Sequence, residues 1–139
     1  MILANEQTNI LFNIVNNSAL ARAITGEVYK YAHPTLTADR PEKENVVVNT
    51  ITLEGNRFQD QTGFANINIH VPSIKTADGV MPNLARFDEL VGLVKEISEV
   101  HDGNLWFSMW IENSRLVKEI SKEGWFFNIK VQFNFQHKY

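Results

Sequence analysis

The sequence predicts an α+β fold in which an antiparallel sheet of about five to six strands has two helices packed on one face. Two segments have apolar residues at the 3.6-residue spacing of a helix, and several others alternate polar and apolar residues as strands do. The expected order is α-β-β-β-α-β-(β)-β, without the regular βαβ alternation of a parallel sheet. The chain has 139 residues and no recognisable repeat or linker, so we expect residues 1–139 to form a single domain.

Residues 5–23 are expected to form the first helix. Asn5 or Thr8 is a candidate N-cap, and Gly26 lies just beyond the expected end. The apolar positions on one face of this helix are Ile10, Leu11, Ile14 and Val15. Their spacing predicts an amphipathic helix with one buried face.

Three strands are predicted in the first half of the chain, at residues 28–31, 45–54 and 65–71. The first ends before His33–Pro34, because the residue preceding a proline avoids the α region. The second is rich in β-branched residues and is expected to be well buried. The third places Ala65, Ile67, Ile69 and Val71 on one face and Asn66, Asn68 and His70 on the other.

Two polar loops separate these strands, at residues 35–44 and 55–63, and a third loop is expected at residues 73–82. The first two contain turn formers and charges of both signs. At an interface, such mixed charge determines register and partner choice more than affinity. We therefore expect the first loop to form a docking surface, and both loops, projecting from a rigid sheet, can reach a neighbouring protein. The candidate contact residues are Asp39, Arg40, Pro41, Glu42, Arg57, Phe58, Gln59 and Gln61.

The second helix is predicted to begin after Asn83, its N-cap, and to end at the turn signal Asp102–Asn104. Its apolar stripe comprises Leu84, Phe87, Leu90, Val91, Val94 and Ile97, with His101 at the far end. The final third is expected to form strands at residues 105–112, 116–120 and 125–135. The last of these alternates most clearly, with one face packed and the other in water.

Two tryptophans in the strand at residues 105–112 are further candidate contact residues. Trp106 and Trp110 share a face opposite Leu105 and Phe107, so this strand is apolar on both faces. Such a strand is either central, with cover on both sides, or partly committed to a subunit interface, where tryptophan is enriched.

No compact set of catalytic residues is recognisable in the sequence. The four histidines lack a metal-ligand spacing, and no serine occupies a nucleophile elbow. Asp39, Glu42 and Glu44 are a conceivable acid–base group, but Arg40 and Lys43 alternate with them, which favours a solvated charge cluster. We therefore expect no enzymatic activity, no metal and no cofactor.

Composition excludes several further classes of protein. The net charge is −3, which gives no basic footprint for gripping nucleic acid or for lying on a membrane surface. There is no cysteine, so disulfides and thiolate chemistry are excluded. The N-terminal residues have no basic region ahead of an apolar run, so we expect no signal peptide, and no apolar run is long enough to span a membrane.

The layout of the chain resembles that of the bacteriophage tail-completion or tail-terminator proteins, small connectors between a phage head and its tail. After an N-terminal helix, the matching segments are Gly26–Tyr29, a proline-bearing loop ending in Arg40–Pro41, Val46–Asn49, Gln61–Gly63 and Asn66–Val71. A long helix and an aromatic-rich C-terminal strand complete the pattern. The resemblance covers nearly the whole chain in layout, but it lies in fold and loops and includes no catalytic signature.

The resemblance implies a structural protein of the virion neck, assembled in the cytoplasm of the bacterial host. Members of this family form a ring, hexameric by analogy, that caps the tail tube, stops its polymerisation and joins it to the head connector. The partners implied are copies of the chain itself and the tail-tube and head-connector proteins, with DNA only as passing cargo. The loops ending in Arg40–Pro41 and containing Gln61–Gly63 would make the contacts.

Two other functions stay open at this point. One is a small-molecule-binding or hydrolytic domain that uses the face of Asn66, Asn68 and His70 as the floor of a pocket. The other is a monomeric protein-interaction adaptor.

Overall fold

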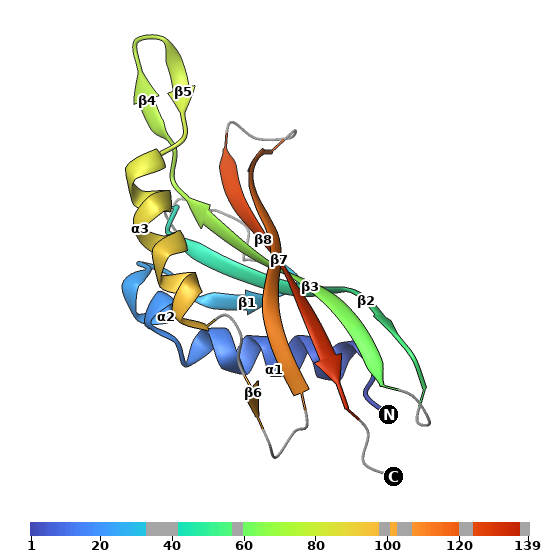
Figure 1. Cartoon of the computed structure of the whole chain (residues 1–139). Coiled ribbons are helices and arrows are strands. Elements are labelled where there is room, and N and C mark those ends of the chain that lie inside the picture. Colours follow the sequence, from blue (N-terminus) through green and yellow to red (C-terminus); the bar gives the residue numbers. More distant parts are fainter. Residues whose placement is uncertain (33–41, 57–59, 98–100, 103–106, 120–123, 137–139) are drawn as a thin grey trace.

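The computed structural model describes residues 1–32, 42–56, 60–97, 101–102, 107–119 and 124–136. Within these residues it has the α+β fold that the sequence predicts (Figure 1). A six-stranded sheet has the order β1-β2-β3-β8-β7-β6, and a separate two-stranded hairpin consists of β4 and β5. The helices lie on one face of the large sheet (Figure 1).

The large sheet is mostly antiparallel. Its strands are β1 (Val28–Lys30), β2 (Asn45–Glu54), β3 (Gln61–Val71), β6 (His101–Asp102), β7 (Phe107–Lys118) and β8 (Trp125–Phe135). The edge strand β1 pairs with β2 in parallel, whereas the other described neighbours are antiparallel. Strand β2 has the predicted bounds, and β3 starts four residues earlier than predicted, so Gln61 lies in a strand and not in a loop.

The N-terminal helix is divided in two, contrary to the prediction of one helix. Helix α1 (Ala4–Asn16) is followed by the short α2 (Ala19–Ala23). The break arises because Asn17 and Ser18 turn their side chains back onto α1, where Asn17 Nδ2 donates to a carbonyl at 2.8 Å and Ser18 Oγ donates to another at 2.6 Å. Neither predicted N-cap is correct, since Leu3 occupies the cap position without a side-chain bond.

Helix α3 (Leu84–Val94) continues into a 3₁₀ turn, η1 (Lys95–Ile97). Its predicted cap is confirmed, because Asn83 Oδ1 accepts a hydrogen bond from the Arg86 backbone at 3.2 Å. The predicted end at residues 102–104 is wrong, since His101–Asp102 forms β6. Leu84 is 57% exposed and does not join the buried stripe, because the first turn of α3 lies beyond the sheet, beside the hairpin (Figure 1).

The third predicted loop contains a β-hairpin, formed by β4 (Ile74–Thr76) and β5 (Gly79–Met81). Its turn needs Gly79, whose φ of +119° is rarely adopted by other residues. Of the two strands predicted at residues 105–112 and 116–120, residues 107–112 and 116–118 belong to the single strand β7, and residues 105, 106 and 120 lie outside the described residues. A bulge between Ile111 and Asn113 interrupts its alternation, which explains why the sequence pattern suggests two strands.

The hydrophobic core lies between the helices and one face of the sheet. Its largest members include Leu11, Ile67, Ile69, Phe87, Leu90, Ile129, Phe133 and Phe135. The predicted alternation of β3 and β8 is confirmed, because Ile67 faces Ile129 within this core while Asn68 faces Asn128 on the opposite side. Alternate residues of both strands therefore point away from the helices.

Candidate functional site

The candidate site is the sheet face that the helices leave open. Strand register places two rows of side chains across it. One row runs from Asn49 through Asn66 and Lys130 to Asn113, and the next runs from Val47 through Asn68 and Asn128 to Arg115. The bulge in β7 reverses the alternation, so that the odd-numbered residues Asn113 and Arg115 share this face with the even-numbered residues of β8.

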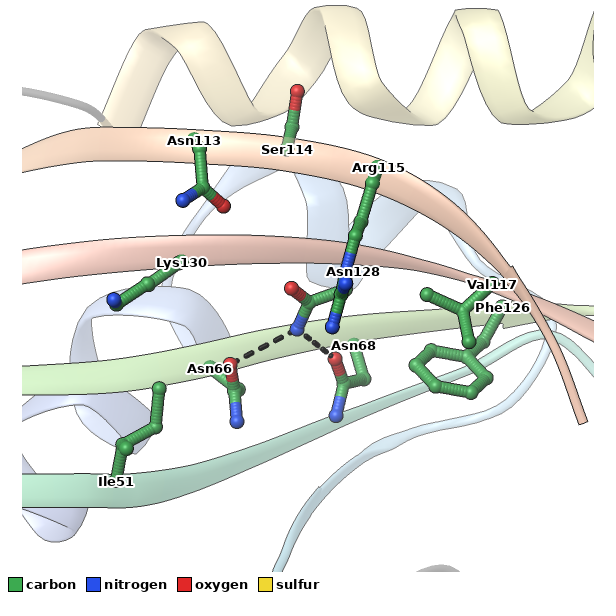
Figure 2. Close-up of a pocket in the computed structure, with 10 residues that line it drawn as sticks. All are labelled: Ile51, Asn66, Asn68, Asn113, Ser114, Arg115, Val117, Phe126, Asn128 and Lys130. Carbon is green, nitrogen blue, oxygen red and sulfur yellow. Dashed lines mark hydrogen bonds between the residues drawn. The ribbon is translucent and has the colours of Figure 1, made fainter.

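An open groove of about 620 Å³ lies over these rows (Figure 2). Four asparagines, Lys130 and Arg115 line it, together with a serine and the apolar side chains of Ile51, Val117 and Phe126. No Asp or Glu is among the lining residues. The groove is therefore a shallow polar surface with net positive charge on a chain whose total charge is −3.

A hydrogen-bond network between asparagine side chains forms the floor of this groove. Asn128 Nδ2 donates to Asn66 Oδ1 at 2.9 Å and to Asn68 Oδ1 at 2.7 Å (Figure 2). Asn66 Nδ2 in turn donates to Asn49 Oδ1 at 3.0 Å. Asn128 is only 9% exposed, so its amide is held away from water and both of its donor hydrogens are used. The network joins β2, β3 and β8 and gives the groove a preorganised polar floor.

Lys130 lies to one side of this asparagine cluster, and the Arg115 side chain reaches over the cluster towards Asn128 (Figure 2). The Lys130 ammonium lies 4.5 Å from the centroid of the Phe64 ring, a cation–π contact that restrains the side chain. Within the described residues, neither Lys130 nor Arg115 forms an ion pair. Both charges therefore line the groove without an ion-pair partner in that part of the chain.

His70 lies on the same face but outside the groove. Its Nδ1 is 3.1 Å from Glu119 Oε1, and its ring stacks on Phe126 with centroids 5.2 Å apart. The predicted polar face of β3 is thus divided: Asn66 and Asn68 line the groove, whereas His70 contacts Glu119 and Phe126.

The structure places three of the predicted contact residues. Glu42 is exposed just ahead of β2, and Trp110 lies half-buried on the open face of β7, in the row of Phe64 and Gln132. Gln61 is only 2% exposed. Its side chain forms two hydrogen bonds with the backbone of Ile2 in the same subunit: Oε1 accepts at 2.8 Å and Nε2 donates at 2.9 Å. The other predicted contacts lie outside the described residues: Asp39, Arg40, Pro41, Arg57, Phe58, Gln59 and Trp106.

Sequence reasoning missed the residues that complete the groove. Asn128 and Lys130 belong to the wet face that the alternation of residues 125–135 predicts, but nothing in the sequence links them to Asn66 and Asn68, about 60 positions earlier. Arg115 lies beyond the bulge, so its face was not predictable from alternation. One pattern in the sequence does point to this pairing: polar residues alternate in the same way along residues 66–70 and 126–134. Two antiparallel strands that lie side by side with one face in water show this matching pattern.

The described residues contain no cluster of three or more His, Asp or Glu side chains that would hold a metal ion. Among the helices of the described chain, none is long and apolar enough to cross a membrane. A scan against protein-family models and a search of curated proteins find no match to this sequence. Functional inference therefore depends on the fold and on the open face of the sheet.

Proposed function

We propose that this chain is a structural subunit of a phage or prophage neck, which assembles with copies of itself into a ring, caps the tail tube and joins it to the head connector. The observation that carries the proposal is that helices cover only one face of the sheet. The other face presents a preorganised groove that crosses β2, β3, β8 and β7 and has no Asp, Glu or His among its lining residues. Such a surface is suited to docking.

Three further points support this proposal. The α+β fold agrees in class with the helix-flanked antiparallel sheet that the family resemblance implies. A ring requires heterologous contacts, in which two different surfaces of each subunit meet, each burying about 1,000 Å² or more. The chain offers different surfaces on its two sides, with helices on one side (Figure 1) and the polar groove on the other.

The proposal is tested in particles from the strain that encodes the chain. Deleting the gene should yield filled heads without joined tails and tail tubes of uncontrolled length, and a plasmid copy should restore joined particles. Quantitative mass spectrometry of sedimented, DNA-filled particles should find a ring's number of copies, and gold-labelled antibody should mark the neck. Normal infectious particles from the deletion strain, or absence of the chain from particles that contain the other tail proteins, would refute the proposal.

A second candidate is a small-molecule site in the same groove, favoured by the preorganised amides of Asn66, Asn68 and Asn128. His70 separates the two functions. If the face is a hydrolytic site, His70→Ala should abolish turnover, because His70 stacks on the groove residue Phe126 and is the histidine beside the groove. Ring assembly should change only modestly, because His70 itself does not line the groove. Shortening the segment 55–63 ahead of β3, at residues 55–60, separates a ring from the monomeric adaptor. It should abolish the self-association of a ring, whereas a monomeric adaptor has no self-association to lose.

A further inference from the structure

We infer that the groove receives the outer surface of α3 from a neighbouring copy of the same chain. This inference rests on the proposed ring and names the two surfaces that would form its repeating contact. The surface on α3, here called the α3 ridge, comprises Leu84, Asp88, Gly92 and Glu96, which follow one another at four-residue intervals along the side of the helix and of the 3₁₀ turn that continues it.

The α3 ridge is exposed along its whole length. The opposite side of the helix is buried in the core through Phe87, Leu90 and Val94, so the ridge points away from the sheet. At Gly92 an added Cβ would have no neighbour within 4 Å, so the middle of the ridge is low and open. A second molecule can therefore approach the helix backbone closely at this point.

The charges of the two surfaces are complementary. Asp88 and Glu96 are exposed and form no ion pair within the described residues. In the groove, Arg115 is exposed and Lys130 is half-buried, and neither forms an ion pair in the same part of the chain. Eight residues of helix separate the two acids by about 12 Å. The two basic residues have Cα atoms about 8 Å apart, on adjacent strands two positions out of register. The Lys130 ammonium lies over the Phe64 ring, one row farther from Arg115, which lengthens the separation of the two charges.

Apolar side chains extend the match at one end. Leu84 is 57% exposed at the start of the ridge, and Ile51 is 45% exposed at the end of the groove nearer Lys130 (Figure 2). Placing Leu84 against Ile51 directs Asp88 towards Lys130 and Glu96 towards Arg115. This arrangement buries two large apolar side chains that are exposed in the single subunit and gives each groove cation an acidic partner.

The two surfaces lie on opposite sides of the sheet, since α3 packs against the core face and the groove is on the open face. A contact between them is therefore heterologous: each subunit uses its ridge on one neighbour and its groove on another. Repetition of that contact produces a chain of subunits that closes into a ring when the rotation allows it.

Charge reversal tests this contact. The groove variant has Arg115→Glu with Lys130→Glu, and the ridge variant has Asp88→Lys with Glu96→Lys. In sedimentation velocity over a concentration series, the wild-type chain should self-associate, less strongly at high salt. Each variant alone should lose at least about a hundredfold in association constant. As a matched control, Arg22→Glu with Lys75→Glu makes the same charge change as the groove variant at exposed positions outside both surfaces.

Mixing the variants gives the decisive result. The groove variant keeps an intact ridge and the ridge variant keeps an intact groove, and the two reversed surfaces are complementary to each other. An equimolar mixture should therefore recover the assembly that each variant alone has lost, with the two variants alternating. Combining all four substitutions in one chain should restore full assembly. Circular dichroism and thermal unfolding of each variant establish that loss of assembly is not loss of folding.

If either variant assembles as the wild type does, the inference is wrong. The proposal of a ring would survive that result, because the ring would then be built through other surfaces. A mixture that stays monomeric, together with a four-substitution chain that does not assemble, would also overturn it. A wild-type chain that stays monomeric at every concentration would overturn the inference as well, and the particle experiment would then decide the proposed function separately.

Discussion

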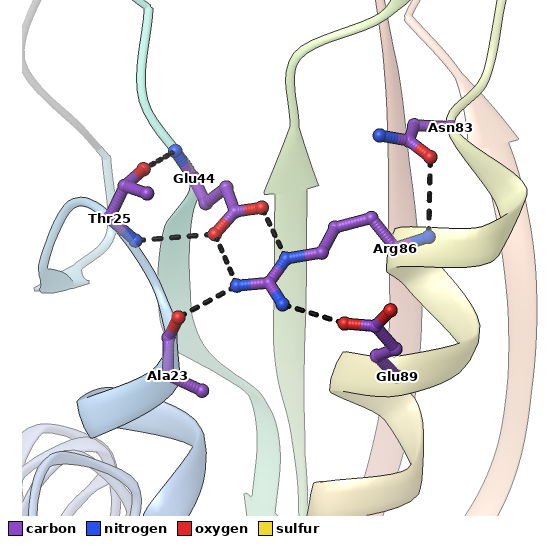
Figure 3. A network of polar contacts seen from close by, with 6 residues as sticks. All are labelled: Ala23, Thr25, Glu44, Asn83, Arg86 and Glu89. Carbon is purple, nitrogen blue, oxygen red and sulfur yellow. Dashed lines mark hydrogen bonds and ion pairs between the residues drawn. The ribbon is translucent and has the colours of Figure 1, made fainter.

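Glu44 and Arg86 form a two-point ion pair that joins the start of β2 to the first turn of α3 (Figure 3). Arg86 Nε donates to Glu44 Oε2 at 2.6 Å, and Arg86 Nη2 donates to Glu44 Oε1 at 2.8 Å. Arg86 also donates to the Ala23 carbonyl at 2.7 Å and to Glu89 at 2.8 Å. Thr25 completes the network, because it exchanges two hydrogen bonds with Glu44. The pair thus connects α2, β2 and α3, three elements distant in sequence.

Removing the guanidinium should destabilise the fold. Arg86→Ala leaves the carboxylate of Glu44, a residue only 8% exposed, without its main partner. We expect a loss of about 2–3 kcal/mol in the free energy of unfolding. Arg86→Lys should recover only part of this loss, since an ammonium does not reproduce the two-point geometry. Urea denaturation measures both. The matched control is Arg22→Ala at an exposed arginine, which should change stability by less than about 0.5 kcal/mol. Equal effects at the two arginines would contradict the structural role.

The same pair predicts how stability depends on pH. Hydrogen bonds from Arg86 lower the pKa of the Glu44 carboxyl below its ordinary value of 4.5. A carboxyl whose pKa is lowered by folding binds protons more readily in the unfolded chain. Its contribution to stability is therefore complete above about pH 4.5 and is lost as the pH falls towards the folded pKa.

Glu44→Gln removes this titration. The variant should be less stable than wild type at pH 7, and the difference should shrink steadily as the pH falls below 4.5. Urea midpoints measured between neutral and acidic pH give the difference directly. A difference that is constant with pH would show that Glu44 is not ionised through its contact with Arg86.

The sequence predicts best those elements whose patterns are local. The run of β-branched residues in β2 lies between Glu44 and Gly55, so its bounds are predicted to the residue. The long alternations in β3 and β8 correctly predict which residues face the core and which face water. Successive side chains of a strand point to opposite faces of the sheet, and this holds whichever strands lie beside it.

The rest depends on contacts that local patterns do not encode. The groove arises from the register between strands about 60 residues apart, and a single bulge decides that Arg115 joins it. The hairpin β4–β5 is short, so its six strand residues offer too little periodicity to separate it from a loop. Gln7 looks like a surface residue of a helix, yet it is fully buried, with Nε2 donating to Thr50, Thr52 and Phe64 at 3.2 Å each.

Gln7 also gives a role to Gly63. A Cβ added at Gly63 would overlap the Gln7 side-chain oxygen, at 1.6 Å, and the fully buried amide has no room to move without losing its hydrogen bonds. Gly63→Ala should therefore lower the free energy of unfolding by about 1–3 kcal/mol, although alanine is normally more favourable than glycine in a strand.

Gly92→Ala is the matched control, because this glycine lies on the exposed side of α3 with open space at its Cβ. It should raise stability by up to about 1 kcal/mol, as alanine is the better helix former. Thermal and urea unfolding of the two variants should thus change in opposite directions. Similar changes at both glycines would contradict the packing of Gln7 against Gly63.

The floor of the groove predicts a difference between two asparagines on the same face. Asn128→Ala removes the donor shared by Asn66 and Asn68 at a position only 9% exposed, so we expect a loss of about 1 kcal/mol in the free energy of unfolding. Asn113→Ala, at an exposed position of the same groove, should cost less than about 0.5 kcal/mol. In wild-type NMR spectra the side-chain amide protons of Asn128 should exchange more slowly with water than those of Asn113. Equal exchange rates would mean that the amide network is not formed, and the groove would then lack the preorganised floor on which docking of a neighbouring helix depends.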